Sequence, residues 1–555
     1  MFSKTVYLEG LVARNFLVKA KALCRSHSTP DKVELKSKLV NLKSGWEGVV
    51  GLEVHAQISS ASKLFSSAST TFGCPVNTNV SLFDAAIPGT LPVLNRRCVE
   101  AGAMTALALS CKLNPVSQFD RKHYFYADLP AGYQITQHRK PLAHDGVLPF
   151  EVYVWQRKEK LYRKKSHVIQ LQLEQDSGKS LHDDKNMRSL VDLNRAGVGL
   201  MEIVFAPDLC SGEEAASLVK ELSLILTRLG TCTCRMEEGA LRVDANVSVR
   251  PSSSPHLGAR SEIKNLGSIR AVALAVDYEI RRQVEELENG RKVGGDTRSW
   301  DADLKMTVPM RDKEVQQDYR FMPDPNLPPL HLLNAVESES SGSSSEKLCT
   351  NDSPNWPPPV DVKVLKAQIP ELPDETREKL RKTLGLPIEA SYILVNEEVL
   401  LSYFFKVLEG KKGRDPKLIA NVLINELLTS VNKADLDLDK CDISTSSIGE
   451  VVDLLESNYV NNQIGRKLMQ CVLEGDHRTP SQIVDENNWR QITDPKEIRK
   501  ICRSVIEGRP DLVKQYRSGK TKVFAAIMGE IFKASQQKAD MASAGKILKE
   551  ILKEG

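Results

Sequence analysis

A short low-complexity stretch divides the chain into two parts with different sequence patterns. Residues 336–346 read Val-Glu-Ser-Glu-Ser-Ser-Gly-Ser-Ser-Ser-Glu, and a Trp-Pro-Pro-Pro run follows at 356–359. A segment with so few apolar residues cannot bury a core, so residues 334–360 are expected to form a solvated linker or insertion. Because 555 residues are too many for one hydrophobic core, we expect two or three domains around this break.

The part before the break, residues 45–333, has the pattern of an α+β domain. Residues 50–57 alternate apolar and polar side chains, as a half-buried strand does. Strand-like runs and helices do not alternate regularly here, which argues against a doubly wound parallel sheet. We therefore predict an N-terminal α+β catalytic domain around a largely antiparallel sheet.

Two helices are predicted within this domain from their end signals. The first spans 211–230, where Ser211 and Glu214 have the spacing of a capping box. The second begins near Ser268 and ends at 289–290. Its apolar residues recur every three or four positions, so one face should be buried.

The part after the break has a helical pattern to the end of the chain. We expect an all-helical domain over 361–480, in which Asp374 caps a helix that stops at Gly385, and a small helical tail domain over 481–555. The tail carries 15 Lys and Arg against 10 Asp and Glu, and its net charge of +5 exceeds the +4 of the whole chain. Such a segment indicates either a polyanionic partner or a solvated helical surface.

The N-terminus has the pattern of a targeting segment. Residues 1–30 contain five Lys and Arg but one acidic residue, with apolar residues between them. This amphipathic, acid-poor pattern is typical of a matrix-targeting presequence, which we place at residues 1–44, so we expect the protein in the mitochondrial matrix. No apolar run approaches the ~18 residues needed to cross a bilayer, so we expect no membrane span.

Several segments of the α+β part carry side chains that bind hard cations or phosphate. Glu53 and His55 stand two apart on the predicted strand, so both should project from one face. Mg²⁺ binds carboxylates while keeping several waters, so an oxygen-rich set suits Mg²⁺ with a nucleotide phosphate. Each of these residues taken alone is more often a solvated or packed side chain than a functional one. Further acidic and basic groups follow in segments at 173–180, 192–195, 200–204, 236–246 and 262–265.

Motifs of other nucleotide-binding and amide-hydrolysing enzymes are incomplete. Gly178-Lys179-Ser180 has the end of a phosphate-binding loop, but Leu173 stands where that motif requires glycine. The chain also lacks a convincing Cys and His pair for thiol-based amide hydrolysis. We therefore do not expect it to hydrolyse glutamine itself.

Ordered segments along the chain resemble the signature segments of a known enzyme family. Residues 50–55 read Val-Gly-Leu-Glu-Val-His, 88–95 read Pro-Gly-Thr-Leu-Pro-Val-Leu-Asn, and 119–126 read Phe-Asp-Arg-Lys-His-Tyr-Phe-Tyr. With these segments the chain resembles the B subunits of the three-subunit glutamyl-tRNA(Gln) amidotransferases over about residues 47–555. The likeness continues through 128–135, 192–202, 236–250, 262–266 and 318–325, and through the helical part to the tail.

The resemblance implies an ATP-dependent correction of mischarged tRNA. Such enzymes bind glutamyl-tRNA(Gln), transfer the γ-phosphoryl group of ATP to the glutamate side chain, and let ammonia displace the phosphate. They are carbon–nitrogen ligases with glutamine as amido donor. The resemblance further implies Mg²⁺ and two partner proteins: an amidase (the A subunit), which releases ammonia from glutamine, and a small C subunit.

By the same resemblance, the reaction site is assigned to side chains of the α+β domain. The implied metal ligands, which are also catalytic, are Glu53, His55, Glu174 and Glu202, with Asp244 and Glu262 close by as further catalytic residues. The residues implied for ATP phosphates are Arg195 and Arg242, and those for the ammonia channel are Lys122 and Gln175.

Departures from the family pattern leave alternatives open. Gln175 stands where bacterial relatives commonly have glutamate, so a protein that presents tRNA without catalysis is one alternative. Amidation of aspartyl-tRNA(Asn) is another, because it needs the same chemistry on a side chain one methylene shorter. The presequence favours glutamate. Some relatives bind zinc through cysteine pairs after the first strand, but here only Cys74 remains in that stretch, so we expect no zinc.

Overall fold

The computed structural model describes residues 45–154, 161–310, 319–335, 359–434, 436, 438, 441, 443–518 and 521–554. The predicted presequence and most of the Ser-rich break lie outside these residues.

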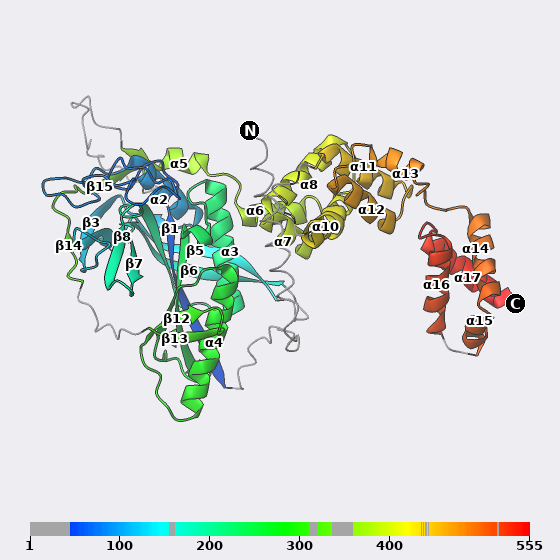
Figure 1. Ribbon diagram of the computed structural model, residues 1–555, viewed down its shortest axis with the longest axis horizontal. Coiled ribbons are helices and arrows are strands. Elements are labelled where there is room, and N and C mark those ends of the chain that lie inside the picture. The colour runs from blue at the N-terminus through cyan, green and yellow to red at the C-terminus, as the bar shows by residue number, and fades with distance from the viewer. Residues whose placement is uncertain are drawn as a thin grey trace, which may run out of the picture.

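A nine-stranded sheet organises the N-terminal part (Figure 1). Every neighbouring pair is antiparallel except β11 and β12, so the predicted α+β fold with a largely antiparallel sheet is confirmed. The strands lie in the order β13 (Met306–Pro309), β12 (Thr297–Asp301), β11 (Ser261–Lys264), β10 (Leu241–Pro251), β1 (Trp46–Gln57), β9 (Gly199–Phe205), β6 (Leu161–Gln175), β5 (Ala143–Tyr153) and β2 (Lys112–Leu113).

The two faces of this sheet differ because its strands alternate apolar and polar residues. On β1, Val50, Leu52 and Val54 are fully buried, and each such side chain contributes about 1.5–3 kcal/mol. Three helices pack on this apolar face: α2 (Arg96–Ala108), α3 (Gly212–Leu229) and α4 (Ile269–Glu288). The intervening residues of β1, Glu53 and His55, therefore project from the opposite face.

Smaller sheets lie beside the large one. Strand β3 (Val116–His123) pairs with β4 (Tyr133–Lys140), β14 (Met322–Pro323) and β15 (Leu330–Leu333), and β15 pairs with β16 (Val360–Asp361). A hairpin of β7 (Lys179–Asp183) and β8 (Arg188–Asp192) stands apart, and a 3₁₀ turn, η1 (Met236–Glu238), precedes β10.

The predicted helix ends are largely confirmed. Ser211 caps α3 by accepting a hydrogen bond from the amide N–H of Glu214, and Ser268 caps α4. The reciprocal half of the predicted capping box is wrong, because the Glu214 carboxylate accepts from the amide N–H of Cys210, at 2.7 Å. It also pairs with Lys164, which explains why it turns away from Ser211.

Helices make up the described chain beyond residue 361. They form two further apolar clusters, one with buried residues from Leu380 to Val484 and one from Ile498 to Leu552. The helices are α5 (Val362–Gln368), α6 (Pro373–Lys382), α7 (Ile388–Asn396), α8 (Glu398–Gly410), α9 (Pro416–Asn421), the π-helical η2 (Val422–Leu428), α10 (Thr429–Ala434), α11 (Thr445–Glu456), α12 (Asn462–Leu473), α13 (Pro480–Glu486), α14 (Pro495–Gly508), α15 (Pro510–Arg517), α16 (Val523–Ala534) and α17 (Met541–Glu554).

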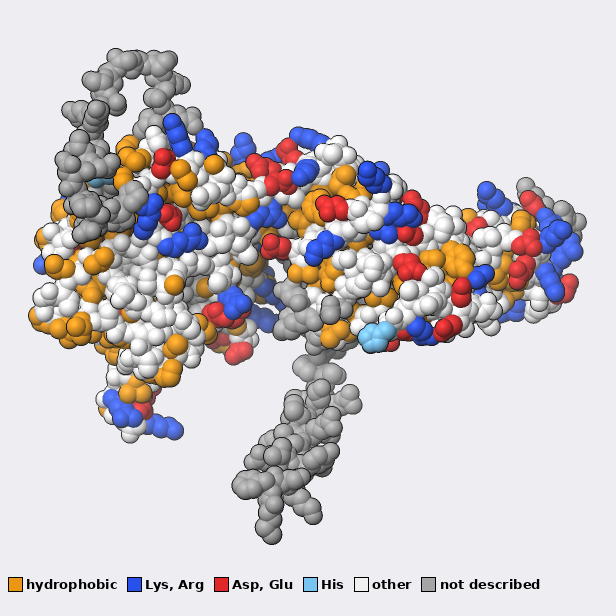
Figure 2. Space-filling view, turned by 90° about the horizontal axis from the view of Figure 1, so that it is seen from above, with side chains coloured by type: hydrophobic (Ala, Val, Ile, Leu, Met, Phe, Trp, Pro, Cys, Tyr) orange, Lys and Arg blue, Asp and Glu red, His pale blue; other side chains and the backbone are white. Residues whose placement is uncertain are grey.

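The tail formed by α14–α17 stands at one end of the molecule, and Lys and Arg side chains gather toward its outer end (Figure 2). Within the described chain, none of the helices combines the length and apolar character that a membrane crossing requires.

Helix α6 corrects one predicted cap. The helix begins at Pro373, and the Glu375 carboxylate accepts from the amide N–H of Leu372 at 3.0 Å, so Asp374 lies in the first turn and is not the cap. Asp374 is engaged instead by Arg163 of β6. The helix ends at Lys382, and Gly385 follows with a left-handed φ of 63°.

A buried ion-pair cluster joins α6 to the sheet domain. The Arg377 guanidinium is fully buried and lies 2.5 Å from Glu221 of α3. Arg381 makes two hydrogen bonds to Glu151 of β5, at 2.5 and 2.8 Å. The two carboxylates and Arg377 are thus buried, where an unpaired charge is costly, and Arg381 pairs from a partly exposed position.

Replacing Arg377 with Met should destabilise the protein by about 3 kcal/mol, because the Glu221 carboxylate would remain buried without its partner. Urea denaturation would measure the effect. Lys382→Met is the matched control, since Lys382 lies on the same helix in an exposed pair that contributes under ~1 kcal/mol. Equal stabilities of the two variants would contradict this account.

Candidate active site on the polar sheet face

Cross-strand register gathers the polar side chains of the large sheet. His55 on β1 lies opposite Glu202 of β9 on one side and Arg242 of β10 on the other. Glu53 lies opposite Asp244 in the same way. Residues directly opposite one another in antiparallel strands project from the same face, so these groups share one surface.

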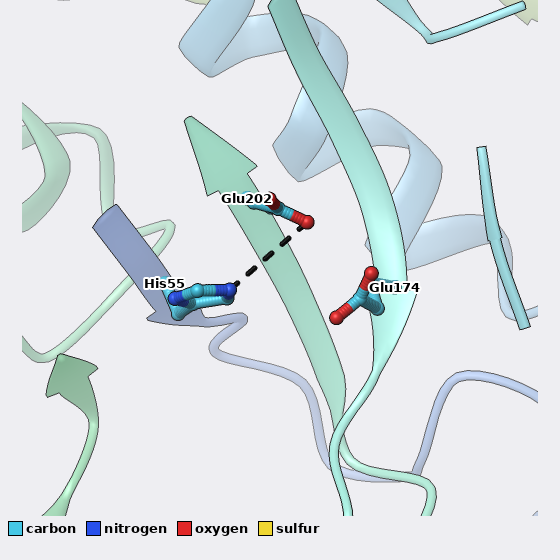
Figure 3. A group of neighbouring side chains, drawn as sticks. All are labelled: His55, Glu174 and Glu202. Carbon is cyan, nitrogen blue, oxygen red and sulfur yellow. Dashed lines mark ion pairs between the residues drawn. The ribbon is translucent and has the colours of Figure 1, made fainter. Parts of the chain in front are cut away.

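His55 and Glu202 form a compact cluster of metal-ligand atoms with Glu174 of β6, and we call these three residues the triad (Figure 3). One atom from each lies within 4.8 Å of the other two, and His55 Nε2 is 4.0 Å from a Glu202 oxygen. They come from β1, β6 and β9, three adjacent strands. It is the one such group of three or more among the described residues, and Glu53 is not part of it.

Burial sets the protonation of the triad. Desolvation raises the pKa of Glu174 to about 7, and the charge of Glu202 adds to the shift. Desolvation likewise raises the pKa of Glu202. Burial lowers the pKa of His55, which keeps the imidazole neutral and leaves a nitrogen lone pair for a metal.

Amide side chains hold the two carboxylates in place. Gln134 of β4 donates to Glu174 Oε1 at 2.6 Å, and Gln172 donates to Glu202 Oε2 at 2.6 Å. Glu174 Oε2 is buried and has no hydrogen-bond partner in the described part of the chain. A buried carboxylate oxygen without a donor fits a metal ligand, because such an oxygen is otherwise destabilising.

Lys122 supplies a positive charge beside the triad. Burial favours its neutral amine, but the charges of Glu174 and Glu202 outweigh that effect and raise the pKa of Lys122. Its Nζ also lies 5.1 Å from the ring centre of Tyr319. Lys122 therefore remains a cation at the edge of the site.

Two arginines meet at a buried carboxylate near the triad. Asp176 is 2 % exposed, and it lies 2.8 Å from Arg242 and 3.6 Å from Arg195. Arg195 also donates to the carbonyl oxygens of Ser177 and Gly178. The Arg242 atom paired with Asp176 is Nη2, whereas its buried Nε has no hydrogen-bond partner within the described residues and leaves one donor for an anion.

The remaining predicted site residues lie around this centre. Glu53 accepts from Asn246 at 2.9 Å and acts electrostatically on His55 and Glu202. Burial raises the pKa of Asp244 to about 6. Glu262, two strands from β1, accepts from Thr297 at 3.3 Å and lies 3.5 Å from Lys264.

Gln175 lies apart from the triad. Its Oε1 accepts from the amide N–H of Ile135 at 3.2 Å, and it lines a cavity of about 240 Å³. The other walls of that cavity include Pro88–Thr90, Leu129–Ala131 and Tyr133.

Comparison with known proteins supports the family seen in the sequence. Residues 48–337 match the GatB/GatE catalytic domain, and residues 403–552 match the GatB domain. The B subunit of the mitochondrial glutamyl-tRNA(Gln) amidotransferase of Aedes aegypti is 54% identical over 92% of this chain and 93% of its own length. The chain belongs to the B-subunit family of tRNA-dependent amidotransferases.

The names of two further relatives differ in the tRNA substrates that they give. The Homo sapiens protein, also named as the B subunit of a mitochondrial glutamyl-tRNA(Gln) amidotransferase, is 45% identical over 91% of this chain and 88% of its own length. The Granulibacter bethesdensis protein, named as the B subunit of an aspartyl/glutamyl-tRNA(Asn/Gln) amidotransferase, is 42% identical over 91% and 98%. The family places this chain among ligase subunits of protein biosynthesis and implies partner subunits.

Four residues of the site were not assigned roles from the sequence. Gln172 and Asn246 stand two residues from Glu174 and Asp244 on their strands, so strand alternation could have placed both on the polar face. Asp176 falls in the acidic segment 173–180, but its pairing with the two arginines depends on contacts between segments distant in sequence. Gln134 left no signal, because its contact with Glu174 depends on how β4 lies against β6.

Proposed function

We propose that this B subunit phosphorylates the glutamate side chain of glutamyl-tRNA(Gln) with ATP and directs its amidation, in a mitochondrial complex with an amidase (the A subunit) and a small C subunit. The observation that carries the proposal is the triad with the donor-bearing Arg242 on the neighbouring strand. The names of the mitochondrial relatives support glutamate as the substrate and the mitochondrion as the location. The matrix is inferred from the presequence pattern alone.

The proposed reaction has two steps, phosphorylation of the glutamate side chain and then its amidation. A carboxylate oxygen of the substrate glutamate attacks the γ-phosphorus of ATP, the bond from that phosphorus to the bridging oxygen breaks, and ADP leaves. Ammonia then attacks the acyl carbon, inorganic phosphate departs, and the amide of glutamine remains. Phosphorylation is needed because a carboxylate oxygen is a poor leaving group.

The chain's own groups supply binding and charge for the first step. Arg242 and Arg195 would hold phosphate oxygens, and the Lys122 cation would offset negative charge near the two glutamates. Two carboxylates and a neutral imidazole, with one carboxylate oxygen lacking a donor, fit Mg²⁺ held by His55, Glu174 and Glu202. When bound, Mg²⁺ would neutralise charge on the transferring phosphoryl group.

Amidation of aspartyl-tRNA(Asn) stays the second candidate, because the bacterial relatives carry both substrates in their names. Parallel assays of the reconstituted complex with the two mischarged tRNAs would separate the candidates. A tRNA-presenting role without catalysis is disfavoured by the intact triad.

Binding of a divalent cation should weaken about tenfold between pH 8 and pH 6. The pKa of Glu174 is about 7, so below this pH the carboxyl holds a proton that the cation must displace, while His55 stays neutral. Titration calorimetry with Mn²⁺ as probe would measure the affinity. Glu262→Gln, outside the triad, should keep the pH dependence, and an affinity independent of pH in the parent protein would refute the prediction.

Changing His55 or Glu202 to Ala should slow formation of phosphorylated glutamyl-tRNA about a thousandfold, the effect of losing ~4 kcal/mol of transition-state stabilisation. Binding of tRNA rests on a wide surface and should hardly change. Release of phosphate from ATP and a filter-binding titration measure the two effects, with the exposed His167→Ala as control. Near-normal phosphate release would show that the metal site is misplaced, and equal loss of tRNA binding would make these residues structural.

Deleting residues 493–555 should weaken tRNA binding but leave glutamine hydrolysis by the partner amidase intact. The cut spares α13, whose Ile483 and Val484 pack in the preceding cluster. Since the tail's excess of basic residues would contact mainly phosphates, the difference between full-length and truncated complexes should shrink as salt rises. Equal affinities at low salt would exclude this role.

A further inference from the structure

We infer that a rim of aromatic and basic side chains beside the triad binds the unpaired 3′ end of the tRNA by stacking on its bases. This aromatic rim consists of Tyr124, Phe125, Tyr126, His138, Tyr319 and Phe321, from the segment after β3, from β4 and from the segment before β14. The inference rests on the proposed function for the identity of the substrate.

Five of the six rings of the rim, all except Phe125, form a connected series. Tyr124 contacts Tyr126 at a centroid distance of 5.5 Å and Tyr319 at 6.2 Å. Tyr319 contacts Phe321 at 6.0 Å, and the Phe321 ring stacks on His138 at 4.1 Å. Such contacts hold the rings in fixed orientations, which lowers the entropy cost of placing a base against them.

The outer part of the rim is open to solvent. Phe125 is 87% exposed and Tyr126 is 50% exposed. The inner face of Phe125 lies over Gly132, where a Cβ atom would stand only 3.0 Å from the ring and where the φ of 71° also favours glycine. The backbone therefore supports an exposed aromatic ring, and clustered exposed apolar surface is typical of a binding site.

The charge of the rim fits a nucleic acid. Lys122 lies under Tyr319, and Lys140 and Arg320 are exposed beside the rings. Of the nearby acids, Asp120 and Asp324 are buried and paired with Arg139 and Arg121, so they add little negative charge to the surface. Asp128 is half-buried and acts electrostatically on Tyr124, so the negative charge beside the rim comes mainly from Asp128 and the triad. Aromatic rings interleaved with cations are the surface that single-stranded nucleic acids bind, through stacking and phosphate contacts.

The position of the rim next to the triad favours the 3′ end of the tRNA as its ligand. Tyr124 donates to Gln134 at 3.3 Å, and Gln134 donates to Glu174, so the rim is connected to the triad through one side chain. In an aminoacyl-tRNA the amino acid is esterified to the terminal ribose. The terminal nucleotide must therefore lie within one glutamyl length of the reaction site, which is where the rim begins, and the preceding unpaired nucleotides extend outward from it.

A binding cycle with two RNAs and two variants tests this inference. Uncharged tRNA(Gln), intact or lacking its unpaired 3′ nucleotides, is titrated against the assembled complex carrying Phe125→Leu or Tyr126→Leu. We expect each variant to bind the intact tRNA about 5- to 100-fold more weakly, the range for loss of a stacked base. Binding of the shortened tRNA should be unchanged, and Phe72→Leu, at a 68% exposed phenylalanine elsewhere, should affect neither RNA.

The alternatives give different results. If the variants weaken both RNAs equally, or neither, the rim does not bind the 3′ end. If they raise the KM for ATP while tRNA binding stays normal, the rings bind the adenine of ATP and the inference is wrong. Equilibrium binding requires no phosphoryl transfer, so these results remain interpretable even if the proposed reaction fails.

Discussion

The register of β1 between β9 and β10 is the constraint on which the site depends. Val50, Leu52 and Val54 must face α2–α4 because their burial stabilises the domain, and this places Glu53 and His55 on the opposite face. A slip of one residue would move His55 into the apolar core and expose a row of valine and leucine. Packing on one face therefore aligns His55 with Glu202 and Arg242 on the other. The burial of apolar side chains that stabilises the sheet therefore also brings the triad residues together.

The buried carboxylates of Glu174 and Glu202 repel each other when both are ionised. The surrounding side chains lower the free-energy cost of this repulsion. Neutral amides do most of the positioning: Gln134 and Gln172 each donate to one triad glutamate. Lys122 contributes a cation at the edge, and among the described residues Oε2 of Glu174 has no hydrogen-bond partner. This arrangement leaves the carboxylates oriented but available. Bidentate arginines would instead lower the raised pKa values of the two glutamates, but they would occupy the oxygens that a metal would need.

Local patterns allowed much of this structure to be predicted, and contacts between distant segments explain the rest. Strand alternation placed Glu53 and His55 together, and cap residues located both ends of α4. The predicted cap at Asp374 failed because Arg163, distant in sequence, engages that side chain. Gln134 could not be found because β4 reaches the triad only through the arrangement of two sheets. Site residues within one strand were thus predictable from spacing, whereas those that depend on packing between sheets were not.

The ion-pair cluster under α6 bears on function as well as stability. If a tRNA contacts the basic tail and places its 3′ end at the triad, as we propose, the two ends of the protein have to keep a defined relation. Arg377 and Arg381 connect α6 to α3 and β5, which belong to the sheet domain that carries the triad. Buried ion pairs of this kind add little net stability compared with apolar packing, but they are geometrically selective, because only one docking of α6 satisfies all four charges. An apolar contact would hold α6 as firmly but would tolerate sliding, and sliding at this joint would be amplified over the length of the helical part.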